Sequence, residues 1–295
     1  MTDPQSPVGF IGLGNMGAPI AQRFTAWPGG LIVCDARPEA TEKAVAAGAV
    51  AVSTAAEVAA GASIISITVL DDEQVRSVIT GPGGILETAT PGTVIAVHST
   101  ISPRTAVDLA ETCEARGVDL VDAPVSGGAA GAEQARLAIM VGGERTAYEK
   151  VKPVFALASD MTIHAGPIGA GTRMKLARNL LHFISFTATT EAARLAEAAG
   201  IDLVKLGKVV RHTDAITGGA GAIMLRDTTA PVDTDDFWHS VFTHVRDLGE
   251  KDVALALDLA DDLDVELPLA RIALTNLGDG LGVGPGDIAT TRSTA

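Results

Sequence analysis

Several features that would point to a specialised class of protein are scarce in this 295-residue sequence. It has only two cysteines, Cys34 and Cys113, and neither stands in a CxxC motif or at metal-ligand spacing from a histidine, so no disulfide framework or zinc site is indicated. The six histidines also lack a metal-ligand spacing. We therefore expect no bound metal and a reducing compartment, the cytoplasm.

Long apolar runs and clustered positive charge are missing too. No segment approaches about 18 uninterrupted apolar residues, and the first residues have no basic region ahead of an apolar stretch. We therefore expect neither membrane insertion nor secretion. The formal net charge is -14, with the lysines and arginines scattered among more numerous carboxylates, which argues against a nucleic-acid partner. An anionic ligand would need local positive groups.

The sequence does contain enough apolar residues, 47%, for a large core, and its length suggests two domains. Up to about residue 165, short apolar runs alternate with helical segments, which is the pattern of a parallel sheet with crossover helices. The expected strands are 8–11, 31–34, 63–69, 93–97, 120–121, 137–141 and 161–164, and the expected helices are 18–24, 39–47, 72–80 and 103–116. Residues 1–165 are therefore predicted to form a doubly wound α/β domain of the Rossmann type.

The pattern changes after residue 171. Residues 174–198 contain neither Pro nor Gly, and Gly200 supplies a helix stop. Helical periodicity returns at 203–210, 240–263 and 267–277, with an interruption rich in Gly, Thr, Pro and Asp at 217–236. We predict that residues 166–295 form an all-α domain begun by a long interdomain helix. From Gly282 onward, turn formers and small polar residues predict a loosely held tail.

A glycine loop follows the first predicted strand and opens the first predicted helix. In such a GxGxxG loop the first glycine allows a tight turn, the second lets the backbone approach a pyrophosphate, and the third lets the helix pack on the strand. The phosphates would rest on the helix N-terminus, where unpaired N–H groups favour anions. The predicted dinucleotide contacts are Gly12, Leu13, Gly14, Asn15, Met16 and Gly17.

Asp35 ends the second predicted strand, about 20 residues beyond the loop, where a carboxylate can hold the hydroxyl groups of the adenosine ribose. This favours NAD over NADP, because the 2'-phosphate of NADP would be repelled. Arg37 lies two residues further and could pair with that phosphate, so NADP stays the less favoured alternative. The plain alternative for Asp35 is a solvated turn carboxylate.

Lys175 and Asn179 lie four residues apart in the long predicted helix, so both can face one hydroxyl group. A neutral lysine could take the proton of an alcohol as hydride leaves for a nicotinamide, and its ammonium could return the proton in reduction. Such a lysine must be desolvated or near a second cation, so that its pKa drops. A lysine on an amphipathic helix is otherwise usually solvated.

Four further segments accompany the glycine loop in order: His98-Ser-Thr-Ile-Ser-Pro103, Asp122-Ala-Pro-Val-Ser-Gly-Gly128, the Lys175 helix and Glu250-Lys-Asp252. With the loop, they resemble the β-hydroxyacid dehydrogenase family, which includes 3-hydroxyisobutyrate dehydrogenases and tartronate semialdehyde reductases, from residue 8 to about residue 277. The resemblance implies a Rossmann-type domain followed by an α-helical domain, with the active site in the cleft between them. It also implies NAD-dependent, reversible oxidation of a small 3-hydroxy acid by a homodimer or homotetramer.

The resemblance also implies roles for single residues. It makes Lys175 the catalytic lysine and Asn179 its helix partner. Lys251 matches a lysine that closes over nicotinamide and substrate, which makes it our candidate for the second cation near Lys175; as a bare sequence feature it would be an exposed charge. The residues that match the substrate-carboxylate loop are Ser126, Gly127 and Gly128. Backbone N–H groups exposed by such glycines can bind a carboxylate.

Three more cofactor contacts are expected, and three residues keep open roles. The expected contacts are Leu70, Ser99 and Thr100, the last two at a strand end where they could reach the nicotinamide ribose or amide. Arg136 and Arg178 depart from the family pattern; each could face the cleft and favour a second anionic group, or lie on a solvated helix face. His244 shares a predicted helix face with Lys251 and could contact substrate or solvent.

The substrate therefore stays open, and so do two other functions. The same scaffold could reduce an imine instead of a carbonyl, because the additional His and Arg residues could serve a different proton path. A dinucleotide-binding regulatory protein without catalysis is the third possibility, since folds and cofactor pockets persist in proteins that only bind.

Overall fold

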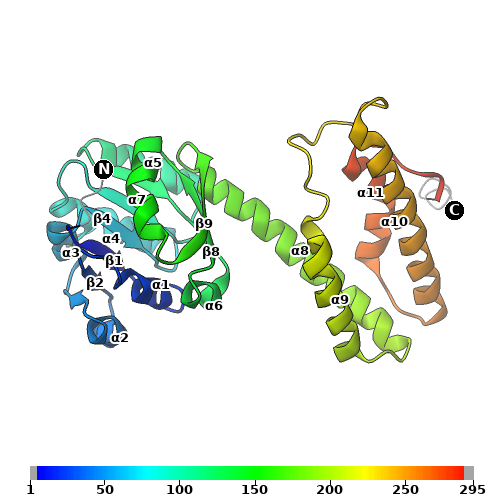
Figure 1. Ribbon diagram of the computed structural model, residues 1–295, viewed down its shortest axis with the longest axis horizontal. Coiled ribbons are helices and arrows are strands. Elements are labelled where there is room, and N and C mark those ends of the chain that lie inside the picture. The colour runs from blue at the N-terminus through cyan, green and yellow to red at the C-terminus, as the bar shows by residue number, and fades with distance from the viewer. Residues whose placement is uncertain (1–4, 289–295) are drawn as a thin grey trace. The chain divides into compact units, whose positions relative to one another are not determined.

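The computed structural model describes residues 5–288, which divide into two compact units with the boundary between Arg178 and Asn179. The first unit is built on one sheet of nine strands (Figure 1). The strands are β1 (Val8–Ile11), β2 (Leu31–Cys34), β3 (Val50–Ala51), β4 (Ile64–Ile67), β5 (Val94–Val97), β6 (Asp119–Asp122), β7 (Val125–Ser126), β8 (Leu137–Gly142) and β9 (Ser159–Gly166). They follow the order β3-β2-β1-β4-β5-β6-β8-β7, and β9 pairs with β8.

The strand order is that of a doubly wound sheet. From β1 the chain proceeds outward through β2 and β3, then returns to the other side of β1 with β4. The order therefore reverses between β1 and β4, and ligands of such sheets bind at the carboxyl ends of the strands beside that point. The glycine loop follows β1 directly.

The sheet is mixed, whereas the sequence pattern predicted a parallel one. Strands β1 to β6 run parallel, but β8 is antiparallel to β6 and β7, and β9 is parallel to β8. The reason is the length of the connection: only residues 127–136 join β7 to β8, and a parallel crossover takes about a dozen residues or more.

Helices cover both faces of this sheet (Figure 1). They are α1 (Gly17–Phe24), α2 (Glu42–Ala46), α3 (Ala55–Gly61), α4 (Asp72–Thr80), α5 (Pro103–Glu114), α6 (Gly128–Glu133) and α7 (Arg145–Phe155). Alternate residues of a strand point to opposite faces, so Phe10 of β1 joins one buried cluster with Phe24 and Phe155. Its neighbour Ile11 joins the other cluster, with Ile79 of α4.

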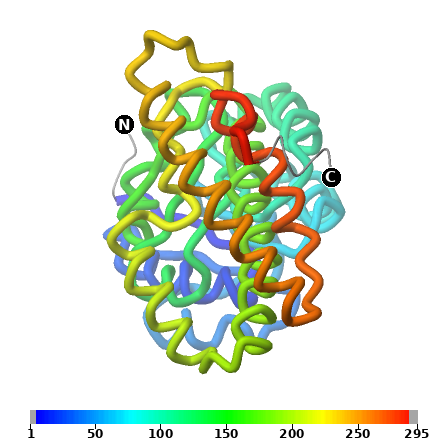
Figure 2. The backbone as a smooth tube through the Cα atoms, turned by 90° about the vertical axis from the view of Figure 1, so that its right-hand side faces the viewer, coloured from blue at the N-terminus to red at the C-terminus, as the bar shows by residue number. Residues whose placement is uncertain are grey.

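Helix α8 (Ala170–Ala198) begins four residues earlier than predicted and continues into the second unit. There it is followed by α9 (Leu203–Thr217), α10 (Phe237–Asp262) and α11 (Pro268–Leu281). Helices α10 and α11 lie side by side in both views (Figures 1 and 2). They share a small core that includes the buried Leu257 and Leu274. Helix α9 has no buried residue. Within residues 5–288, no helix combines the length and apolar character needed to span a membrane.

The segment after α11 is fixed by α10, so the expectation of a loosely held tail is wrong up to residue 288. A guanidinium N–H of Arg246 donates to the carbonyl oxygens of Val283 (3.3 Å) and Gly284 (3.2 Å). The buried carboxylate of Glu250 accepts a hydrogen bond from the N–H of Gly286 at 2.8 Å. Residues 289–295 lie outside the described part of the chain.

Candidate active site

The glycine loop forms a backbone cradle between β1 and α1. The N–H of Gly12 donates to the carbonyl of Cys34 at 2.9 Å, and a Cβ on Gly17 would collide with the carbonyl oxygen of Gly12. At Gly14 the situation is the reverse, because a Cβ there would meet no heavy atom of the described chain within 4 Å. The loop is thus tight where the helix meets the strand and open where a pyrophosphate would approach, so it fits a dinucleotide.

Asp35 is tied to the same loop. Its Oδ2 accepts a hydrogen bond from the N–H of Leu13 at 2.6 Å, and its Oδ1 accepts one from the N–H of Arg37 at 2.8 Å. The exposed guanidinium of Arg37 lies 3.6 Å from the same carboxylate. The carboxylate that would receive ribose hydroxyls and the cation that would receive a 2'-phosphate are therefore immediate neighbours.

The loops after β4 and β5 form the next part of the sheet edge. The hydroxyl of the buried Ser99 donates to the carbonyl of Val69 at 2.7 Å and accepts from the N–H of Val69 at 2.9 Å. Thr100 and Leu70, by contrast, are exposed. Ser99 thus holds the β4–α4 loop in place, while the side chains of Thr100 and Leu70 lie at the surface beside it.

Lys175 is a buried lysine in the second turn of α8, with 9% of its surface exposed. Its Nζ donates a hydrogen bond to the carbonyl oxygen of Val125 in β7 at 2.5 Å. Burial lowers the pKa of Lys175, and the positive charge of Arg178 lowers that pKa further. Both effects favour the neutral amine that a general base requires.

Arg178 thus supplies an effect that the sequence had suggested for Lys251. It lies three residues beyond Lys175 on the same helix, a spacing that places side chains on neighbouring positions of one face. The sequence left open whether Arg178 faces the cleft or solvent. Its spacing of three residues from Lys175 was the feature that could have indicated an effect on the pKa of the lysine. Asn179, half-buried, follows one turn after Lys175.

The proposed carboxylate loop lies next to the residue that receives the lysine. Val125 is followed in β7 by Ser126, and Gly127 (φ +132°) and Gly128 (φ +66°) then turn the chain into α6. These positive φ values lie in a region that favours glycine. The first unit therefore places the amine of Lys175 one residue from the start of the loop that the resemblance assigns to the substrate carboxylate.

Two buried polar residues of this region were not recognised from the sequence. Asp122 ends β6, is completely buried, and accepts hydrogen bonds from the N–H groups of Gly169 and Thr172 at the start of α8. His98 follows β5, and its ring nitrogens lie 2.7 Å from the carbonyl of Ala123 and 3.0 Å from Oγ of Ser66. Burial lowers the pKa of His98 to about 4. Both residues belong to the motifs named above, but their partners are distant in the sequence, so the sequence alone could not indicate these contacts.

In the second unit, α10 carries the other predicted site residues. His244 and Lys251 are both exposed, and Nζ of Lys251 lies 3.1 Å from a carboxylate oxygen of Asp252. The neighbouring Glu250 is buried, so the Glu-Lys-Asp run is only in part a surface charge run. Arg136, in the first unit, is exposed and lies 3.6 Å from the carboxylate of Asp160.

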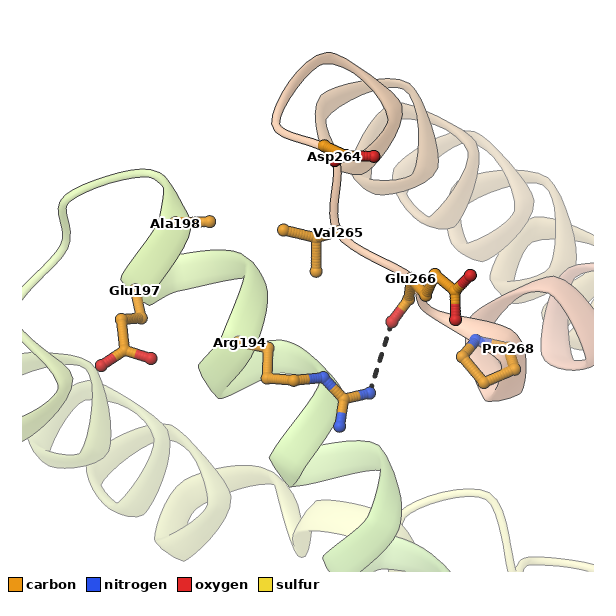
Figure 3. Close-up of a pocket in the computed structure, with 7 residues that line it drawn as sticks. All are labelled: Arg194, Glu197, Ala198, Asp264, Val265, Glu266 and Pro268. Carbon is orange, nitrogen blue, oxygen red and sulfur yellow. Dashed lines mark hydrogen bonds between the residues drawn. The ribbon is translucent and has the colours of Figure 1, made fainter.

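A separate hollow of about 550 Å³ lies wholly within the second unit (Figure 3). The end of α8 forms one wall, and the α10–α11 connection forms the other; a guanidinium N–H of Arg194 donates across it to the carbonyl of Glu266 at 3.3 Å. None of the predicted site residues lines this hollow. Among residues 5–288, no three His, Cys, Asp or Glu side chains gather into a potential metal site.

Two family models together match nearly the whole chain. Residues 7–166 match the NAD-binding domain of 6-phosphogluconate dehydrogenase. Residues 169–277 match the NAD-binding domain of NADP-dependent 3-hydroxyisobutyrate dehydrogenase. The first match ends four residues before the start of α8, and the second begins one residue before it.

Individual relatives agree with these models. An uncharacterised oxidoreductase of Mycobacterium tuberculosis is 54% identical, with 99% of each chain covered. The 2-(hydroxymethyl)glutarate dehydrogenase of Eubacterium barkeri is 32% identical over 95% of this chain and 90% of its own. The crystal structure of an oxidoreductase of Mycobacterium avium 104 is 56% identical and superimposes with a TM-score of 0.90 over 95% of this chain and 99% of its own.

Proposed function

Since the chain belongs to the β-hydroxyacid dehydrogenase family and is an NAD(P)-dependent dehydrogenase of the 3-hydroxyisobutyrate type, we propose that it oxidises a small 3-hydroxy acid reversibly, with Lys175 as the general acid and base. The observation that carries the proposal is the burial of Lys175 beside the Ser126–Gly128 loop, with a lowered pKa. A lysine kept only for solubility would not be buried in this way.

In the proposed reaction, the neutral amine of Lys175 accepts the proton of the substrate hydroxyl as the C–H bond gives up a hydride and the C=O bond forms; a bound nicotinamide would be the hydride acceptor. In the reverse direction the ammonium returns the proton to the oxygen. The carbonyl of Val125 orients the amine, because it accepts one N–H of Nζ at 2.5 Å and so leaves the lone pair to point elsewhere. Ser126 and the N–H groups of Gly127 and Gly128 receive the carboxylate. For Asn179 as a partner and Lys251 as a substrate contact, the support is the family resemblance.

We propose NAD as the preferred cofactor, held by the Gly12–Gly17 cradle and by Asp35. When bound, the nicotinamide supplies the hydride acceptor or donor. The support is the carboxylate of Asp35 at the end of β2, where it would repel a 2'-phosphate. The measurement is the ratio of kcat/KM for NAD and NADP with one substrate. A ratio in favour of NADP would refute the preference and point to Arg37.

The role of Lys175 is tested by Lys175→Ala. We expect kcat for the oxidation of 3-hydroxyisobutyrate to fall by about 10² to 10⁴-fold, the usual contribution of a general base. The Kd for NADH, measured by fluorescence, should stay within about threefold because Lys175 lies outside the glycine loop. Lys152→Ala, at an exposed lysine of α7 that takes no part in the proposed site, is the matched control. Turnover that survives in Lys175→Ala would refute the proposal.

The substrate itself is tested by a small panel. Two members are 3-hydroxyisobutyrate, with one carboxylate, and 2-(hydroxymethyl)glutarate, with two. A preference for the second would agree with a guanidinium, Arg178 or Arg136, that receives a second anionic group. Cyclic imines complete the panel, and absorbance at the NADH band reports turnover. Turnover of imines alone would replace the hydroxy-acid proposal.

We also propose that the protein is a homodimer or homotetramer, through its helical unit. The support is the exposure of large apolar side chains on α8 and α9, among them Phe183 (59% exposed) and Val204 (67% exposed). Exposed apolar side chains mark interfaces where they form a large patch. Sedimentation equilibrium would give two or four times the mass of the chain, whereas a monomer at micromolar concentration would refute the proposal.

A further inference from the structure

The helix that carries Lys175 starts on a buried carboxylate. Asp122 is completely buried at the end of β6, and its Oδ1 accepts the N–H of Gly169 at 2.7 Å while its Oδ2 accepts the N–H of Thr172 at 2.6 Å. These N–H groups are among those that a helix start leaves without partners. A negative charge at this end of α8 also interacts favourably with the helix dipole.

The same turn lies directly on the backbone of the sheet. A Cβ on Gly171 would collide with the carbonyl oxygen of Met140 and would stand 2.6 Å from that of Asp122. A Cβ on Gly142, the residue paired with Asp122 across β6 and β8, would stand 2.8 Å from the N atoms of Ala170 and Gly171. The start of α8 therefore has no room to shift towards the sheet.

Lys175 makes a second attachment to the same segment. Its Nζ bonds to the carbonyl of Val125, three residues after Asp122, and the chain continues into Ser126 and the glycine loop. A single stretch, residues 122–128, thus contacts the first turn of α8 through a carboxylate and the second turn through the lysine amine. The position of that amine relative to the loop depends on both contacts.

We propose that Asp122 is a positioning residue, whose carboxylate fixes the start of α8 and thereby sets the place of the Lys175 amine beside the Ser126–Gly128 loop. The inference rests on the proposed role of Lys175. Because both oxygens of Asp122 accept N–H groups, the ionised carboxylate is the form that fits. Burial raises the pKa of Asp122, and the backbone N–H bonds from Thr172 and Gly169 oppose that rise.

The test is Asp122→Asn, which keeps the volume but directs an NH₂ group at one of the two N–H donors. We expect kcat for 3-hydroxyisobutyrate to fall by about 10 to 100-fold, as displacements near 1 Å can cause. The Kd for NADH should stay within about threefold, because the glycine loop is untouched. In a Lys175→Ala background, Asp122→Asn should cause no further loss, since no amine remains to be positioned.

The matched control is Glu191→Gln. Glu191 is also buried, and its two oxygens accept the N–H groups of Leu269 (2.8 Å) and Ala270 (2.9 Å) at the start of α11, which carries no proposed site residue. It should lower Tm as Asp122→Asn does, but leave kcat within twofold. This contrast separates a loss of stability from a loss of positioning.

Two results would overturn the inference: a folded Asp122→Asn enzyme with kcat within twofold of the parent, or an equal loss of turnover with and without Lys175. The two failures are distinguishable. Turnover that survives in Lys175→Ala would overturn the proposed function and this inference with it, whereas turnover that survives only in Asp122→Asn would overturn this inference alone.

Discussion

His98 makes the stability of the first unit depend on pH. Burial lowers the pKa of its imidazole from 6.5 to about 4, because the ring is packed against the rings of Phe10 and Phe155 and only 3% of the residue is exposed. The neutral ring donates from Nδ1 to the carbonyl of Ala123, which can only accept, so Nε2 accepts from the hydroxyl of Ser66. A folded-state pKa below the unfolded value means that the unfolded chain binds the proton more readily.

The contribution of the neutral His98 to the free energy of unfolding is therefore complete above pH 6.5, and it is lost progressively as the pH falls to about 4. At about 1.4 kcal/mol for each unit, the full loss is about 3 kcal/mol in the free energy of unfolding. Between about pH 7.5 and 4.5, most of this loss should already be present. Other groups titrate in the same range, so the quantity that isolates His98 is the difference between the parent and a variant that cannot titrate.

The variant is His98→Asn, whose amide can still donate to Ala123 from about the position of Nδ1. The assay is urea unfolding followed by tryptophan fluorescence in a Trp238→Phe background, which leaves the buried Trp27 of the first unit as the reporter. Between the two pH values, the parent should lose about 2 to 3 kcal/mol more than the variant. Equal losses in both proteins would show that His98 is not held neutral, and the reasoning from its burial would be refuted.

Three further changes have definite expected outcomes. Arg178→Gln should raise the pKa of Lys175, since a neighbouring positive charge is removed. The acid limb of the pH profile of kcat/KM for oxidation should then move to higher pH. The control Arg173→Gln, on the same helix, should leave that limb in place. Asp35→Asn should lower the preference for NAD over NADP by about tenfold, or about 1.4 kcal/mol, measured as the ratio of the two kcat/KM values; an unchanged ratio would remove Asp35 from cofactor choice. Glu250→Gln should destabilise the second unit by about 1 to 3 kcal/mol because Gly286 loses a buried charged acceptor. The measurement is urea unfolding followed by Trp238 fluorescence, and a stability equal to that of the parent would contradict the role of this contact.

The sequence was informative where local pattern and burial coincide. The strands β1, β2, β4 and β5 are short runs of apolar residues buried on both faces, and their positions were predicted within a few residues. The helix α4 was predicted with its exact bounds, because charged and apolar residues alternate at helical spacing and Asp71 caps its start. Such features depend on neighbours within one or two turns.

Other elements depend on contacts that local pattern does not contain. The short strand β7 exists because β8 folds back beside it, and the polar helix α7, which contains Pro153, is held by the apolar side chains of Tyr148 and Phe155 against the sheet. Helix α3 was also missed, although Thr54 and Glu57 form a capping box that could have indicated it.

The candidate site divides in the same way. The glycine loop was predicted from residue type and spacing, whereas the roles of Lys175 and the Ser126–Gly128 loop were predictions implied by the family resemblance. The contact of Asp122 with the start of α8 was not predicted in either way, because three strands and two helices (β7, α6, β8, α7 and β9) separate Asp122 from its partners in the chain.

The contact between Asp122 and α8 also bears on the order of folding. Its partners Gly169 and Thr172 are 47 and 50 residues distant in the chain, and β8 must already lie beside β6 before the first turn of α8 can rest on Gly142. Until then Lys175 is an ordinary solvated amine with a pKa close to that of any lysine. The buried amine that we propose as the general base thus depends on the completed sheet, and a chain with an incomplete sheet cannot present it.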